Sequence, residues 1–131
     1  MWIAAFAGSA LAMLVLDGIW LSTTAKWLYR PQLGDILMSG FRPIPAVIFY
    51  FIYVTGIVIL AVAPGLASAR LSVTLSRGLA LGLVAYATYD LTNQATLRQW
   101  STLVSIVDIG WGTVLTGAAA TAGYLAARWA A

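Results

Sequence analysis

The sequence predicts an all-α integral membrane protein, a four-helix bundle with a longer interfacial connection after its first span. Two observations predict this class. First, 62% of the 131 residues are hydrophobic and only 8% are charged, whereas a soluble domain carries about 25% charged residues. Second, the apolar residues form four runs of about 20, the length with which a helix crosses a hydrocarbon core of ~30 Å. We therefore expect a single transmembrane domain over residues 1–131.

The four spans are expected at residues 2–22, 44–62, 76–96 and 102–127. The first lacks the basic start of a signal peptide, and its apolar run is longer than in such a peptide, which favours a retained span. The second is closed by the Ala-Pro-Gly-Leu stretch that begins at Ala63, because proline and glycine interrupt helices. The connection between the third and fourth spans is very short, so these two are expected to be antiparallel neighbours.

The connection between the first two spans mixes cations with aromatic residues. It contains Lys26, Trp27, Tyr29, Arg30, Phe41 and Arg42. This mixture is typical of a segment at the level of the lipid headgroups. A short interfacial helix, broken near Pro31, is expected within it.

The absence of certain residue types excludes several kinds of site. The chain contains no cysteine and no histidine. By itself it therefore cannot form disulfides, ligate an iron–sulfur cluster, or bind haem or zinc through these residues. The seven basic residues are dispersed, which argues against nucleic acid as a partner. Membrane lipid is the expected surrounding, a homo-oligomer or a larger membrane complex stays open, and no cofactor is indicated.

Three of the four acidic residues lie inside predicted spans: Asp17, Asp90 and Asp108. Each is close to the span end that faces the same side of the membrane. At 1.5 Å per residue, each lies roughly 8–10 Å inside that boundary. The three carboxyl groups are therefore expected in one layer, contributed by three different helices.

Polar and aromatic residues accompany these acids at helical spacing. Tyr86, Tyr89, Asp90 and Asn93 fall at i, i+3, i+4 and i+7, on one helix face. The predicted ligand-binding set is Asp17, Trp20, Tyr50, Tyr53, Tyr86, Tyr89, Asp90, Asn93, Asp108 and Trp111. Arg30, Arg42 and Arg98 are expected at its rim. The layer would form a cup with acids at the floor, phenols on the wall and cations near the opening.

Carboxylates within lipid are costly, about 2.5–3.5 kcal/mol at a helix centre on insertion scales. The three acids are therefore expected to face one another, a cation or water, and a metal ion held by Asp17, Asp90 and Asp108 is one possibility. In the alternative interpretation each acid hydrogen-bonds a neighbouring side chain and only fixes helix register. Three functions stay open: binding or transport of a small ligand, ion or lipid-like molecule; catalysis on a lipid or isoprenoid; and a structural or assembly role in a membrane complex.

Several motifs resemble one known family. "YDLTN" at residues 89–93, "ATL" at 95–97, the following Trp100 and "VDIGWGT" at 107–113 are similar to the bacterial family of predicted membrane proteins called domain of unknown function 2177. "LDGIWL" at 16–21 and "FYFIYVTG" at 49–56 are similar to its remaining segments. The resemblance implies a multi-pass protein of the bacterial inner membrane. It implies no activity, since the family has none assigned.

Overall fold

The computed structural model describes residues 1–38 and 40–131 and contains helices without any strand in this part of the chain. Helix α1 (Trp2–Thr24) continues through a π-helical segment, η1 (Ala25–Tyr29), into α2 (Arg30–Leu33). Helix α3 (Pro43–Ile57) continues through η2 (Val58–Val62) into α4 (Ala63–Ser68). Helices α5 (Leu71–Thr96) and α6 (Thr102–Ala130) complete the fold. Each of these four helical runs is long and apolar enough to cross a membrane, which confirms the predicted all-α four-span class.

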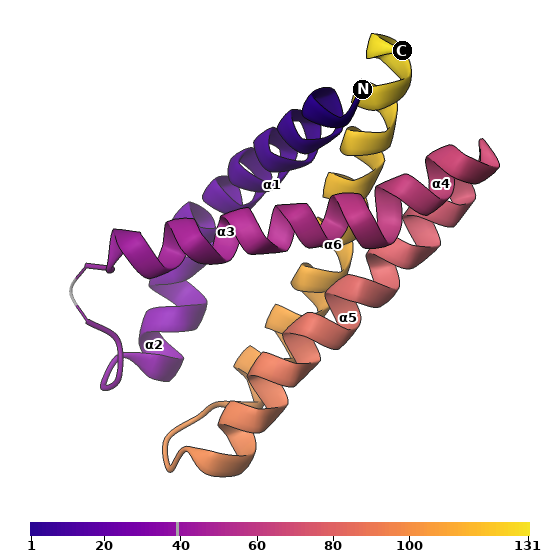
Figure 1. The fold of residues 1–131 in the computed structure, drawn as a ribbon. Coiled ribbons are helices and arrows are strands. Elements are labelled where there is room, and N and C mark those ends of the chain that lie inside the picture. Colours follow the sequence, from indigo (N-terminus) through magenta and orange to yellow (C-terminus); the bar gives the residue numbers. More distant parts are fainter. Residues whose placement is uncertain (39) are drawn as a thin grey trace.

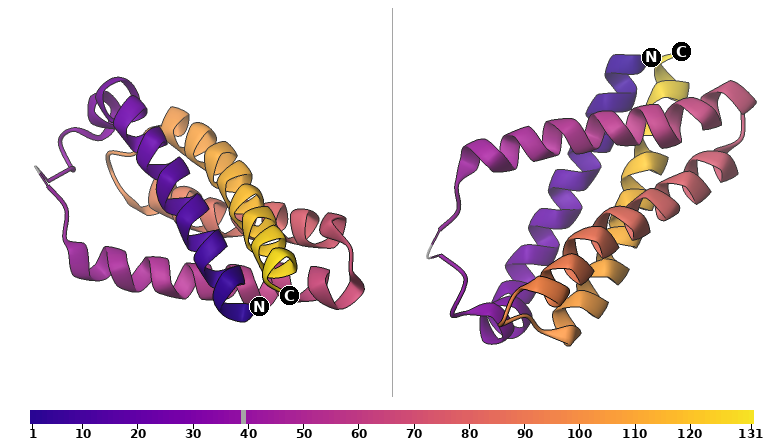
Figure 2. Two further views of the ribbon diagram at one scale, coloured as in Figure 1. Left: turned by 90° about the horizontal axis from the view of Figure 1, so that it is seen from above. Right: turned by 60° about the horizontal axis from the view of Figure 1, so that its bottom comes forward.

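Helix α6 is the centre of the packing. It makes its most extensive contacts with α5 on one side and α1 on the other, and α3 crosses the bundle obliquely (Figure 1). The two chain termini lie together at one end (Figures 1 and 2). The connections that follow α2 and α5 lie at the opposite end (Figure 2). The molecule therefore has a terminal end and a connection end.

Close approach of α5 and α6 depends on glycine. A Cβ atom at Gly82 would collide with the carbonyl oxygen of Gly112 and lie 2.8 Å from the Thr116 side chain. A Cβ atom at Gly112 would in turn collide with the ring of Tyr86. Small residues at such contacts allow the extensive van der Waals packing that holds membrane helices together. The same contact presses the Tyr86 ring against α6.

Both π-helical segments end two residues before a proline, η1 before Pro31 and η2 before Pro64. Proline lacks an N–H, and its ring conflicts with the carbonyl four residues earlier. A wider π turn is one way in which a helix accommodates such a local defect. In η2, the carbonyl of Ala61 accepts a hydrogen bond of 2.9 Å from the Thr74 hydroxyl of α5. The helices therefore continue through both prolines.

This continuity changes the predicted boundaries. The first helical run reaches Leu33, whereas the first span was expected to end at residue 22 and a separate interfacial helix was expected to break near Pro31. The second run reaches Ser68, beyond the expected end at residue 62. The starts of the second and fourth runs, and the end of the third, lie within one residue of the expected positions.

Candidate functional site

A cavity of about 650 Å³ lies near the connection end of the bundle. Side chains from all four helical runs line it, together with residues of the connections that follow α2 and α5. Eight of the predicted site residues line the cavity: Asp17, Trp20, Arg30, Tyr53, Tyr86, Tyr89, Asp90 and Asp108. The three acids predicted to share one layer therefore surround one space.

Asp17, on α1, is held by two aromatic donors. The Tyr50 hydroxyl of α3 donates to Asp17 Oδ2, and the Trp111 indole N–H of α6 donates to Asp17 Oδ1 over 3.3 Å. The Trp111 ring also stacks on Trp20, with centroids 4.5 Å apart and an interplanar angle of 5°. Tyr50 and Trp111 do not themselves line the cavity. They fix the position of an acid that does.

Asp108, on α6, is held by the first helical run. The Tyr29 hydroxyl donates to Asp108 Oδ1 over 2.7 Å, and the same hydroxyl accepts a hydrogen bond of 2.9 Å from the Trp20 indole. Trp20 and Tyr29 are nine positions apart. Because η1 widens the helix between them, both side chains reach the same side of the cavity. The π-helical segment thus joins α1 to the acid on α6.

Asp90, on α5, differs from the other two acids. Its side chain has no exposed area, and neither of its carboxyl oxygens has a hydrogen-bond donor among the described residues. Asp108 is the neighbouring charged group. Two ionised carboxylates are both acceptors, so a hydrogen bond between them requires a proton on one of them. Asp90 is therefore a buried carboxyl group to which no described residue donates a hydrogen bond.

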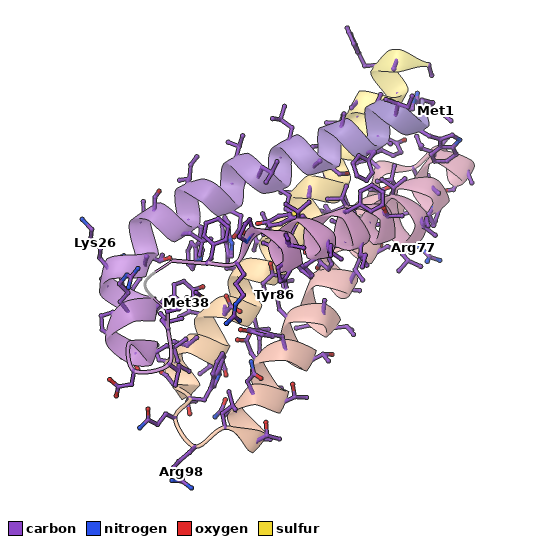
Figure 3. The ribbon with its side chains drawn as sticks, turned by 60° about the vertical axis from the view of Figure 1, so that its left-hand side comes forward. Met1, Lys26, Met38, Arg77, Tyr86 and Arg98 are labelled. Carbon is purple, nitrogen blue, oxygen red and sulfur yellow. The ribbon has the colours of Figure 1, made fainter. Side chains whose placement is uncertain are left out.

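Five of the predicted residues do not line the cavity: Tyr50 and Trp111, which hold Asp17, and Asn93, Arg42 and Arg98. Asn93 lies farther along α5, while Arg42 and Arg98 belong to the two connections. Figure 3 shows Arg98 and Lys26 projecting outward, whereas Tyr86 lies toward the middle of the molecule. Three cations were expected at the rim, and Arg30 is the one of them that is among the described residues lining the cavity.

Other lining residues were not in the predicted set, notably Tyr29, Phe49 and Trp100. Tyr29 had been assigned to the headgroup level, because the sequence gives no sign that the first helix continues past residue 22. Trp100 donates a hydrogen bond of 3.0 Å to the Ser105 hydroxyl, which holds its indole beside the start of α6. The sequence signal for Trp100 is its place directly after "ATLRQ", in a short connection between two acid-bearing spans.

The acids do not form a chelating group for a metal ion. Among residues 1–38 and 40–131, no three histidine, cysteine, aspartate or glutamate side chains are grouped in a way that could hold a metal. Asp17 and Asp108 already accept hydrogen bonds from aromatic residues. The arrangement favours a site that would contact a bound molecule through both its carboxyl groups and its aromatic side chains.

Comparison with protein families gives one match. The model of the predicted membrane protein family DUF2177 matches residues 2–125. The chain belongs to the DUF2177 family. Comparison with curated proteins found no match, and comparison with solved structures found none. For this DUF2177 protein, the family description and the four apolar helical runs agree on a membrane protein.

Proposed function

We propose that this DUF2177 protein binds a small molecule in the cavity at its connection end, for transport or for presentation within the membrane. The observation that carries the proposal is the buried carboxyl group of Asp90, which has no hydrogen-bond partner within residues 1–38 and 40–131 and lies in the wall of a cavity of about 650 Å³. Native proteins contain few buried polar atoms without partners. Ionisable residues inside membrane bundles are typically part of binding or transport sites.

The size and lining of the cavity support this function. Ligand sites are typically clefts of about 300–1,000 Å³ with apolar and aromatic walls and a few placed polar groups. Here Phe49, Tyr53 and Tyr86 provide aromatic surface, while Asp17 and Asp108 provide polar groups whose positions are fixed by hydrogen bonds. A residue that served only helix register would accept hydrogen bonds from neighbouring helices, as Asp17 and Asp108 do, whereas Asp90 has no such bond among the described residues.

We place the protein in the bacterial inner membrane. The physical support is that helical bundles and closed barrels are the two ways to satisfy backbone hydrogen bonds in lipid. Outer-membrane-type proteins use the barrel, whereas the described residues of this chain form helices.

Blocking the cavity tests the proposal. Ala85, on α5, lines the cavity, while the adjacent Val84 is 63% exposed on the outside of the helix. Purified wild type and the Ala85→Trp and Val84→Trp variants would be heated with a library of small molecules. A ligand at 100 times its Kd stabilises a protein by about 2.7 kcal/mol. We expect at least one compound to raise the melting temperature of wild type and Val84→Trp but not of Ala85→Trp.

Equal shifts in all three proteins would place binding elsewhere and contradict the proposal. No shift with any compound, together with co-purification of a stable hetero-complex, would instead support the structural or assembly role.

The adjacency of Asp90 and Asp108 favours a second candidate, an enzyme that acts on a lipid or isoprenoid. Neighbouring carboxyl groups can divide the roles of general acid and general base. Incubation of the protein in vesicles of bacterial lipid extract, followed by mass spectrometry, would reveal a product that is absent with Asp90→Asn. Unchanged lipids with the wild type would reject this candidate.

A further inference from the structure

The charges around the cavity are unbalanced. Asp17, Asp90 and Asp108 line it, and Arg30 is the one basic residue among the described lining residues. The hydrogen bonds that Asp17 and Asp108 receive come from neutral phenol and indole groups. These donors orient a carboxylate and leave its negative charge in place. An occupant with positive charge would restore the balance.

Asp90 gives a second reason to expect an occupant with positive charge. Its carboxyl group is fully buried and receives no hydrogen bond from any described residue, and its neighbour is another acid, Asp108. Burying an ionised group without a partner is strongly unfavourable, so such a group either keeps a proton or faces a cation. A cation bound in the cavity would stabilise the ionised form of Asp90 and Asp108 together.

The wall of the cavity suits an organic cation. Aromatic side chains from the first three helical runs and from the connection before α6 line it: Trp20, Tyr29, Phe49, Tyr53, Tyr86, Tyr89 and Trp100. The faces of such rings attract ammonium groups, and the attraction grows when the cation is desolvated. A hard metal ion would instead require several oxygen ligands around one point, and the described acids are not grouped in that way.

We infer that the ligand of this cavity is an organic cation, an ammonium compound with an apolar body, whose charge lies against Asp108, beside the buried carboxyl group of Asp90, and whose body lies against the aromatic wall. This inference rests on the proposed function and specifies its ligand class. Arg30, at the exposed edge of the cavity, would disfavour a second positive charge there. The inferred ligand therefore carries its charge at the inner end and its apolar part toward Arg30.

Three probes of nearly equal shape separate charge from size. Benzyltrimethylammonium is cationic, neopentylbenzene is its uncharged counterpart, and phenylmethanesulfonate is anionic. Binding of each would be measured by calorimetry with the full chain in uncharged micelles. We expect the cation to bind at least tenfold more tightly than the uncharged compound, and the anion not to bind.

Two variants locate the charge that is responsible. Asp90→Asn keeps the shape of the side chain and removes its charge, and we expect it to weaken binding of the cation at least tenfold. Asp35→Asn removes an acid that lies outside this cavity, and we expect it to leave binding unchanged. Tighter binding of the uncharged probe by Asp90→Asn than by the wild type would further identify Asp90 as the group that selects a cationic ligand.

Each other outcome is decisive. Preferential binding of the uncharged or anionic probe would overturn the assignment to cations and leave the proposed binding site intact. Equal cation binding by wild type and Asp90→Asn would overturn the role assigned to Asp90 in selecting the charge. Absence of binding by all three probes, in a protein that some other compound stabilises in the cavity-blocking experiment, would also overturn only the ligand class. Absence of stabilisation by any compound would overturn both proposals.

Discussion

Tyr29 donates a hydrogen bond of 2.7 Å to Asp108, although 79 positions separate the two residues. The bond ties the last turns of the first helical run to α6, and the same hydroxyl accepts from Trp20. Tyr29→Phe would leave both Asp108 and the Trp20 indole without this partner. Removing one partner of a buried hydrogen bond typically costs about 1–3 kcal/mol.

We therefore expect Tyr29→Phe to lower the free energy of unfolding by about 1–3 kcal/mol, measured by reversible denaturation in micelles. Tyr89→Phe is the matched control, because Tyr89 is 57% exposed and its change should stay within about 0.5 kcal/mol, as for other surface substitutions. Equal effects of the two substitutions would show that the Tyr29 bond adds nothing to stability.

Asp90 and Asp17 should respond differently to loss of their charge or side chain. Asp90→Asn removes a carboxyl group that no described donor contacts, so we expect the free energy of unfolding to stay within about 0.5 kcal/mol of the wild type or to rise. Asp17→Ala leaves the donors of Tyr50 and Trp111 unpaired and should cost about 1–3 kcal/mol. Both values come from the same denaturation assay. A severe loss in Asp90→Asn would mean that the carboxylate has a structural role.

The contact between α5 and α6 should not tolerate a methyl group. Gly82→Ala places a Cβ against the backbone of Gly112, and overpacking of this kind typically costs about 1–3 kcal/mol. Gly110→Ala is the control on the facing helix, because no atom lies within 4 Å of the added Cβ. We expect Gly110→Ala to be neutral or stabilising, since alanine favours helices by up to about 1 kcal/mol over glycine. The melting temperatures of the two variants would be measured under the same conditions. Similar melting temperatures would argue against close packing of α5 and α6.

The number of membrane crossings can be tested with single cysteines, because the chain contains none of its own. Ser68 ends α4, and Gln99 lies in the connection between α5 and α6; both are exposed. We expect Ser68→Cys and Gln99→Cys to react with an impermeant maleimide from opposite sides of the membrane. Reaction of both from one side would contradict four crossings.

The fold class and the convergence of the acids were predictable because they depend on helical geometry alone. Asp17, Asp90 and Asp108 all lie in regular α-helical parts of their runs, where a rise of 1.5 Å per residue relates sequence to depth. The predicted tyrosines on α5 follow from the same regular spacing. Counting along the chain therefore located the three acids and four of the aromatic residues that line the cavity, Trp20, Tyr53, Tyr86 and Tyr89.

Two of the residues outside the predicted set, Tyr29 and Trp100, lie where that regularity stops. Tyr29 belongs to η1, and neither the π turn nor the continuation through Pro31 is visible in a hydropathy pattern. Trp100 belongs to a connection, whose shape depends on hydrogen bonds rather than on a repeat. The sequence also could not show that Asp90 lacks a hydrogen-bond donor among the described residues. A pattern shows which residues share a helix face, but not which donors reach them.

The two chain ends lie together at the terminal end of the bundle (Figures 1 and 2), whereas the residues that line the cavity belong to the connection end. A fluorescent protein or affinity tag joined to either end would be carried on the membrane surface away from the cavity. Immobilisation through such a tag would leave the connection end facing the solution. Binding could then be measured on an oriented surface, with the tag in place and the ligand supplied from the opposite side.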